Sequence, residues 1–173
     1  MEGFKLIGEG EIANIGEYAR EYIKKYPDVR IYVGCDSANR RKYSLYGITV
    51  CFRHPGNGVH ITFKRVKVEK IRDMFSRLWK EVEFCKEVGE YLETELKGLY
   101  LVEGSKPEEK LVDLDLDLNK NVKWKSNRVL DAGVGYLTGL GFRVRSKPTA
   151  WASSCAADMI GRKTKDIHIN VKQ

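Results

Sequence analysis

The strongest fold signal in this chain is the segment Val29-Arg30-Ile31-Tyr32-Val33-Gly34-Cys35-Asp36-Ser37. Its β-branched and aromatic residues predict a β-strand in which alternate residues, from Val29 to Cys35, share one apolar face. The other face carries Tyr32 and Gly34 beside the charged Arg30. Apolar residues on both faces predict a strand in the interior of a sheet rather than at its edge.

Asp36 stands at the carboxyl end of this predicted strand and is followed by polar residues. An aspartate that ends a buried strand costs free energy unless it is hydrogen-bonded or bound to a cation. An aspartate at such a position also commonly caps a turn. Both interpretations of Asp36 stay open on this segment alone.

The chain has 173 residues, a formal net charge of +7 at pH 7 and a pI of about 9.2. This length predicts one domain over residues 1–173, with a helical extension over 1–28 and a tail over 163–173. No apolar run has the length of a membrane span, and the first residues do not resemble a signal peptide, so we expect a cytoplasmic protein. The basic balance is compatible with a nucleic-acid partner, or with solubility alone.

The four cysteines are scattered without a Cys-x-x-Cys pair, and the three histidines show no ligand spacing. We therefore expect buried, free cysteines rather than a zinc site or a disulfide framework.

Periodicity and turn signals predict an α/β protein with three consecutive antiparallel strands, followed by helix-connected parallel strands. The expected architecture has three layers: a mixed five-stranded sheet flanked by helices, with an extra helix at the N-terminus. Strands are predicted over residues 29–37, 43–53, 59–68, 111–119 and 142–147, and helices over 9–25, 71–96, 126–140 and 150–162.

Acidic residues occur on four of these elements. Glu81 lies at the border of the buried face of the 71–96 helix, as does Glu93, but the two are three turns apart, so one site can use only one of them. Asp113, Asp115 and Asp117 alternate along one face of the 111–119 strand, where their mutual repulsion needs solvent or a cation to relieve it. Spacing alone does not decide between Asp115 and Asp117.

Several motifs occur in a characteristic order between about residues 31 and 163. They are Val33-Gly34-Cys35-Asp36-Ser37, Leu116-Asp117-Leu118-Asn119, Ser126-Asn127, Gly139-Leu140-Gly141-Phe142, Lys147-Pro148-Thr149-Ala150-Trp151-Ala152 and Ala157-Asp158. In this order the chain resembles the ribonuclease H-like proteins of the YkuK type, which are small, largely uncharacterised proteins of bacteria and their phages.

The resemblance implies a ribonuclease H-like fold in which four acids act as catalytic residues and bind two Mg2+ or Mn2+ ions: Asp36, Glu81, Asp117 and Asp158. It favours Asp117 over Asp115. Two such ions about 3.5–4 Å apart activate water and stabilise charge in phosphodiester hydrolysis, and hard cations prefer oxygen ligands. The implied function is a metal-dependent nuclease acting on RNA, an RNA–DNA hybrid or branched DNA.

Two other functions stay open. Folds do not determine function, so the chain is alternatively a non-catalytic module that binds nucleic acid or a protein partner. It is also possible to interpret the acidic face of the 111–119 strand as a solvated surface of a structural subunit. The sequence does not predict the oligomeric state.

Neighbouring polar residues complete the expected site. Hydrogen bonds to the metal ligands are expected from Ser37, Asn119 and Asn127, although Asn127 is equally well explained as part of a helix cap. Substrate contacts are expected from Arg40, Arg41, Lys123, Lys125, Lys147 and Trp151. The alternatives are solvated loops for the cations and packing against the protein for Trp151.

Overall fold

The structure is a computed structural model. It describes the chain except residues 8–9, 57, 100–109, 117–125, 148 and 162–173, and within residues 126–128, 157 and 159–161 it describes the backbone only.

In the described part of the chain, seven strands form one mixed sheet in the order β2-β1-β5-β4-β3-β6-β7. The centre is an antiparallel meander, whose members are β3 (Arg30–Asn39), β4 (Tyr43–Arg53) and β5 (Val59–Glu69). On one side β3 pairs in parallel with β6 (Val112–Leu116), which pairs in parallel with β7 (Arg143–Ser146). On the other side β5 pairs antiparallel with β1 (Phe4–Leu6), which pairs with β2 (Glu11–Ile12).

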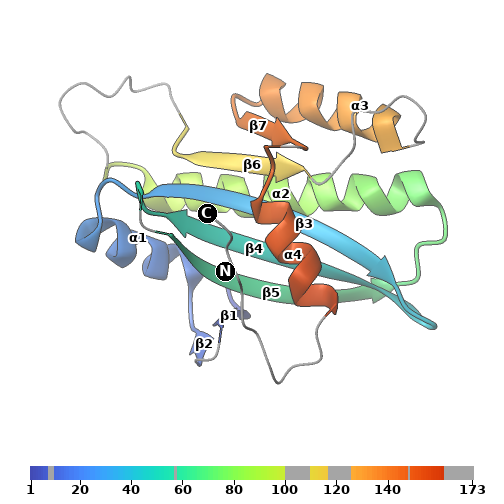
Figure 1. The fold of residues 1–173 in the computed structure, drawn as a ribbon, viewed down its shortest axis with the longest axis horizontal. Helices are drawn as coiled ribbons and strands as arrows, with labels where there is room; N and C mark the ends of the chain where they lie inside the picture. The colour runs from blue at the N-terminus through green and yellow to red at the C-terminus, as the bar shows by residue number, and fades with distance from the viewer. Residues whose placement is uncertain (8–9, 57, 100–109, 117–125, 148, 162–173) are drawn as a thin grey trace.

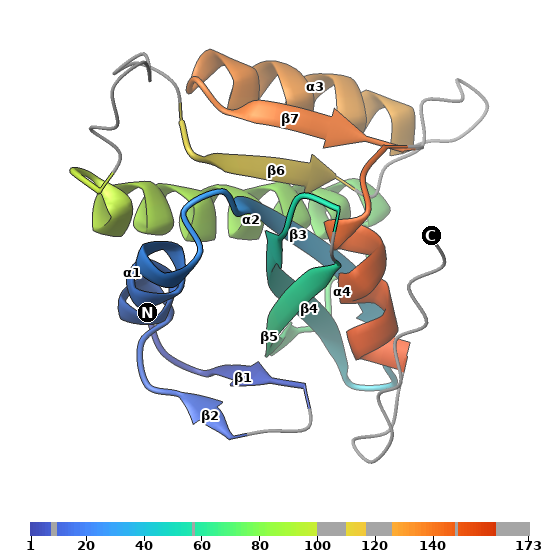
Figure 2. The same cartoon turned by 60° about the vertical axis from the view of Figure 1, so that its left-hand side comes forward.

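The helices cover both faces of this sheet, which gives three layers (Figures 1 and 2). One face carries α1 (Ile15–Lys25), α2 (Met74–Leu96) and α3 (Ser126–Gly139). The opposite face carries α4 (Ala152–Gly161), which crosses β3 and β4. None of the helices in the described part of the chain is long and apolar enough to cross a membrane.

The prediction of five strands was wrong, and so was the start of the first helix. Residues 4–12 add the strands β1 and β2, and α1 begins at Ile15 rather than at Glu9. The physical reason is the cap: the side-chain oxygen of Asn14 accepts a hydrogen bond from the Gly16 backbone N–H at 2.8 Å, so the helix starts after it. Ile12 is buried, but as a residue of β2.

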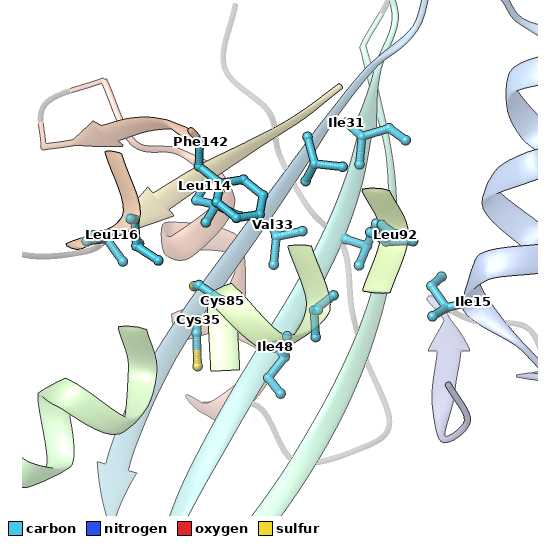
Figure 3. Packing of buried hydrophobic residues seen from close by; sticks show 14 of the residues in the cluster. Ile15, Ile31, Val33, Cys35, Ile48, Cys85, Leu92, Leu114, Leu116 and Phe142 are labelled. Atoms are coloured by element: carbon cyan, nitrogen blue, oxygen red, sulfur yellow. The ribbon is translucent and has the colours of Figure 1, made fainter. Parts of the chain in front are cut away.

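The main hydrophobic core lies between the sheet and the helices α1, α2 and α3 (Figure 3). Ile31, Val33 and Cys35 contribute one face of β3 to it, as their alternation predicts. A smaller apolar cluster, centred on Tyr32, Cys51, Ile61 and Ala152, lies between the sheet and α4. β3 is thus buried on both faces.

Gly34 allows α4 to approach β3 very closely. A Cβ atom at this position would lie 2.3 Å from the Ser153 backbone nitrogen and 2.4 Å from the Ala152 carbonyl carbon. No side chain fits there without moving the helix. The glycine two residues before Asp36 therefore places the start of α4 against the central strand.

Candidate active site

Asp36 lies in the second half of β3, on the most central part of the sheet. It is opposite Gly47 of β4, and the residue before it, Cys35, is opposite Leu116, the last described residue of β6. Its side chain is half-buried. Asp36 thus comes directly after the last described pair between β3 and β6, three residues before the end of β3.

Glu81 reaches β3 from α2 and is almost completely buried, with 2% of its surface exposed. The Ser37 hydroxyl donates a hydrogen bond to Glu81 Oε1 at 2.5 Å, and Arg77 Nη1 lies 3.9 Å from the same oxygen. Glu81 is thus hydrogen-bonded to the residue that follows Asp36.

Arg77 holds this contact in place. Its Nη1 donates hydrogen bonds to the backbone oxygen of Ser37 at 2.9 Å and to the Ser37 Oγ at 2.5 Å. Because the guanidinium uses an acceptor position of the hydroxyl, the single hydroxyl proton of Ser37 is available for Glu81. Tyr46 donates to the Arg77 backbone oxygen at 3.1 Å, which connects α2 to β4 as well.

Two of the four predicted metal ligands affect the pKa of the buried Cys35 thiol. Burial raises the pKa of Cys35 well above its ordinary value, and Cys85 and the charges of Glu81 and Asp36 raise it further.

Asp115 of β6 has a different set of partners. It is fully buried, and the Arg145 guanidinium of β7 donates to its two oxygens at 2.9 and 3.1 Å. The backbone N–H groups of Trp151 and Ala152 donate to the same carboxylate at 2.9 and 2.8 Å. Burial raises the pKa of Asp115, and the donors from Ala152 and Arg145 oppose that rise. Asp115 thus anchors the start of α4 to the sheet.

Asp113 also pairs with an arginine of β7, because Arg143 Nε donates to its Oδ1 at 2.7 Å. Asp113 is 6% exposed and Asp115 is fully buried, so the interpretation of this face as a solvated surface was wrong for both. The expected repulsion is relieved by guanidinium groups. The signal that could have revealed this is the alternation Arg143-Val144-Arg145, which matches Asp113-Leu114-Asp115 in period and is opposite in charge.

Of the other two predicted metal ligands, the structure describes Asp158 but not Asp117. Asp158 lies on α4 with an exposed side chain. Among the described residues, no three His, Cys, Asp or Glu side chains form a group that could hold a metal ion. The set of four acids therefore stays a prediction. The described part of the chain does not include Asp117, Asn119, Lys123 and Lys125, and it includes only the backbone of Asn127, in α3.

The predicted substrate residues that are described occupy different positions. Arg40 and Arg41 are exposed in the turn between β3 and β4, and Lys147 is exposed after β7. Trp151 is half-buried and packs edge-to-face on Tyr32, with 5.0 Å between ring centroids. Its ring therefore contacts the sheet face beside α4.

Comparison with known proteins agrees with this architecture. The family model described as "Ribonuclease H-like" matches residues 12–162, which include β3 to β7 and all four helices. No curated protein and no solved structure matches the chain. The matched range covers most of the sequence and excludes β1, which is an addition to the edge of the sheet. This chain belongs to the ribonuclease H-like family.

Proposed function

We propose that this protein is a metal-dependent nuclease that hydrolyses phosphodiester bonds of RNA, an RNA–DNA hybrid or branched DNA. The observation that supports this most directly is the hydrogen bond between Glu81 of α2 and Ser37, the residue that follows Asp36 on β3, in a chain of the ribonuclease H-like family. One carboxylate belongs to the central strand and the other to a helix far along the sequence.

The donor set fits Mg2+ or Mn2+. Both ions prefer oxygen ligands, and Asp36 and Glu81 offer carboxylates in a partly or fully dehydrated environment. Asp36 and Glu81, completed by Asp117 and Asp158, would hold two such ions. Bound there, they would generate hydroxide near neutral pH and stabilise charge on the phosphate oxygens.

The chain's own residues would prepare this site. Ser37 and Arg77 fix one oxygen of Glu81, so the carboxylate does not have to lose side-chain freedom when a ligand arrives. The anchoring of α4 by Asp115 keeps the helix that carries Asp158 against β3. The proposed reaction thus depends on the Ser37–Glu81 contact and on the anchoring of α4, which lie on opposite faces of β3.

The test is cleavage of labelled RNA, RNA–DNA hybrid and branched DNA substrates with Mg2+ or Mn2+. We expect Asp36→Asn and Glu81→Gln to reduce the rate at least about 100-fold, which corresponds to roughly 2.7 kcal/mol of transition-state stabilisation. The matched control is Asp131→Asn, which removes one exposed carboxylate from α3. Undiminished cleavage by folded Asp36→Asn protein would exclude the proposed site.

A second candidate function is a non-catalytic module that binds nucleic acid or a protein. The observation that favours it is the partner set of Glu81: a hydroxyl donor and a nearby guanidinium already compensate the buried charge. Calorimetric titration with Mn2+ separates the two functions. Absence of Mn2+ binding at millimolar concentration, together with intact nucleic-acid binding, would establish the non-catalytic module.

A further inference from the structure

Arg30 and Arg53 form an unusual pair at the end of the sheet away from Asp36. They lie directly opposite each other on β3 and β4, where β3 begins and β4 ends on the left of Figure 1. Both side chains are exposed. Like charges at directly opposed positions destabilise a sheet. Neither guanidinium has an ion pair within the part of the chain that the structure describes.

The two arginines share the α4 face of the sheet with an aromatic pair. Arg30 lies two residues before Tyr32, so both side chains are on the same face. Trp151 packs on Tyr32, and the Arg53 guanidinium carbon is 6.0 Å from the centroid of the Trp151 ring. A half-buried indole and two exposed arginines therefore lie on the same face of the sheet.

Two other arginines on this face are paired with aspartates. Arg143 and Arg145 extend the same face on β7, and each is paired with one buried aspartate of β6. Arg30 and Arg53 thus add two positive charges beside two arginine–aspartate pairs.

We propose that Arg30, Arg53 and Trp151, named here the Arg30–Arg53 surface, bind the phosphate backbone of a nucleic acid. Guanidinium groups bind phosphate through paired N–H donors, and an indole beside them offers a face for a base or sugar. A phosphate between the strands would turn the repulsion of the two arginines into a shared attraction. This surface would be a second contact with the substrate, remote from Asp36. It rests on the proposed function only because both proposals take nucleic acid as the partner.

The distance along β3 sets a lower limit on the length of nucleic acid that can contact both places, because α4 crosses β3 at Gly34, between them. Arg30 and Asp36 are six residues apart, which is about 20 Å in an extended strand. At 3.4 Å per base pair this equals about six base pairs. A duplex much shorter than this cannot contact Asp36 and the Arg30–Arg53 surface together.

The first experiment measures binding without cleavage. The dissociation constant of a labelled RNA–DNA hybrid of about 20 base pairs is measured in EDTA between about 50 and 200 mM salt. We expect Arg30→Gln/Arg53→Gln to bind more weakly and to reduce the slope of log K against log salt by about 1.8, or 0.9 per lost contact. The control is Lys24→Gln/Lys25→Gln on α1, which removes the same net charge and should leave the slope unchanged.

An unchanged slope and affinity in Arg30→Gln/Arg53→Gln would overturn the proposal. Binding of inorganic phosphate that depends on both arginines, without binding of the hybrid, would also overturn it in favour of a small anion.

The second experiment separates this inference from the proposed function. If the protein cleaves the hybrid, Arg30→Gln/Arg53→Gln should raise KM for long duplexes, leave kcat unchanged, and have no effect on a four-base-pair substrate. Cleavage with unaltered KM would reject the Arg30–Arg53 surface and keep the nuclease. Arginine-dependent binding without any cleavage would keep the surface and reject the nuclease.

Discussion

Glu81 has a charge whose burial is tolerated because two neighbours compensate it. Ser37 donates a hydrogen bond to it, and Arg77 supplies a positive charge and fixes that donor. A buried carboxylate that loses a hydrogen-bond partner has to pay its full desolvation cost. The hydroxyl of Ser37 is therefore as important for stability as it is for the proposed site.

Ser37→Ala should lower the free energy of unfolding by about 1–3 kcal/mol, because it leaves Glu81 Oε1 without this donor. Urea unfolding followed by circular dichroism measures the change. Ser154→Ala, at an exposed position of α4, is the control and should change stability by less than about 0.5 kcal/mol. Equal stability of the two variants would show that the Ser37–Glu81 contact contributes nothing.

The four cysteines should differ strongly in reactivity. A hydrogen bond with the Cys51 thiol lowers the pKa of Cys155, against the opposing effect of partial burial, whereas burial raises the pKa of Cys35, Cys51 and Cys85. Because the thiolate is the reactive form, a lower pKa moves the alkylation curve of Cys155 to lower pH.

Iodoacetamide should therefore label Cys155 first in the folded protein, with a midpoint at a lower pH than that of an ordinary thiol. Peptide mass spectrometry at a series of pH values identifies the site, and urea-unfolded protein, in which all four should react alike, is the control. Earlier labelling of Cys35 or Cys85 would contradict the burial described for them.

Among the elements, α4 is attached to the sheet at one end by two specific features. Asp115 accepts from the first backbone N–H groups of the helix, and Gly34 leaves room for its backbone. The first satisfies donors that every helix start leaves unpaired, and the second brings helix and strand into direct backbone contact.

Gly34→Ala should destabilise the protein by about 1–3 kcal/mol, since its methyl group overlaps the backbone of α4. Gly135→Ala provides a matched control: it lies in α3, nothing approaches within 4 Å of the added carbon, and it should stabilise by about 0.4–1 kcal/mol. Thermal unfolding of the two variants measures the expected loss of stability in the first and the expected gain in the second. A neutral Gly34→Ala variant would show that α4 does not pack on β3 this closely.

Repulsion between Arg30 and Arg53 destabilises the pairing of β3 with β4. The proposed binding of phosphate at the Arg30–Arg53 surface explains why both arginines are present. Arg30→Glu would place opposite charges across the pair, so the free energy of unfolding should rise by about 0.2–1 kcal/mol at low salt. Arg30→Gln should give a smaller rise, because it removes repulsion without adding attraction. Urea unfolding at two salt concentrations measures the gain, which should shrink at high salt. Loss of stability in Arg30→Glu would contradict the described register.

At the scale of the whole molecule, local sequence patterns predicted most helices and strands. They failed where contacts between distant segments determine the structure. The bounds of β4 agree with the prediction because its alternation ends at a Pro55-Gly56 turn. Ile12 fits the apolar stripe of α1, so periodicity alone could not assign it to β2.

The site shows the same division. The Val33-Gly34-Cys35-Asp36-Ser37 motif indicated Asp36 and Ser37 because strand and polar signals are adjacent there. Arg77 was missed, since its contact with Ser37 depends on how α2 crosses β3. The neutralisation of Asp113 and Asp115 was missed because it requires the register of β6 against β7. The resemblance to the YkuK type is consistent with the family that the chain belongs to.

The hairpin of β1 and β2 covers part of the outer edge of β5. β5 has eleven residues and would be the outermost strand of the meander, but β1 pairs with its middle at Phe63 and Thr62. Within the described residues the sheet ends in strands of two and four residues, β2 and β7, and edges that short offer little template for another chain to join. A protein that lacks residues 1–12 would also expose the part of the β5 edge that β1 covers, and intermolecular strand pairing would then compete with solubility.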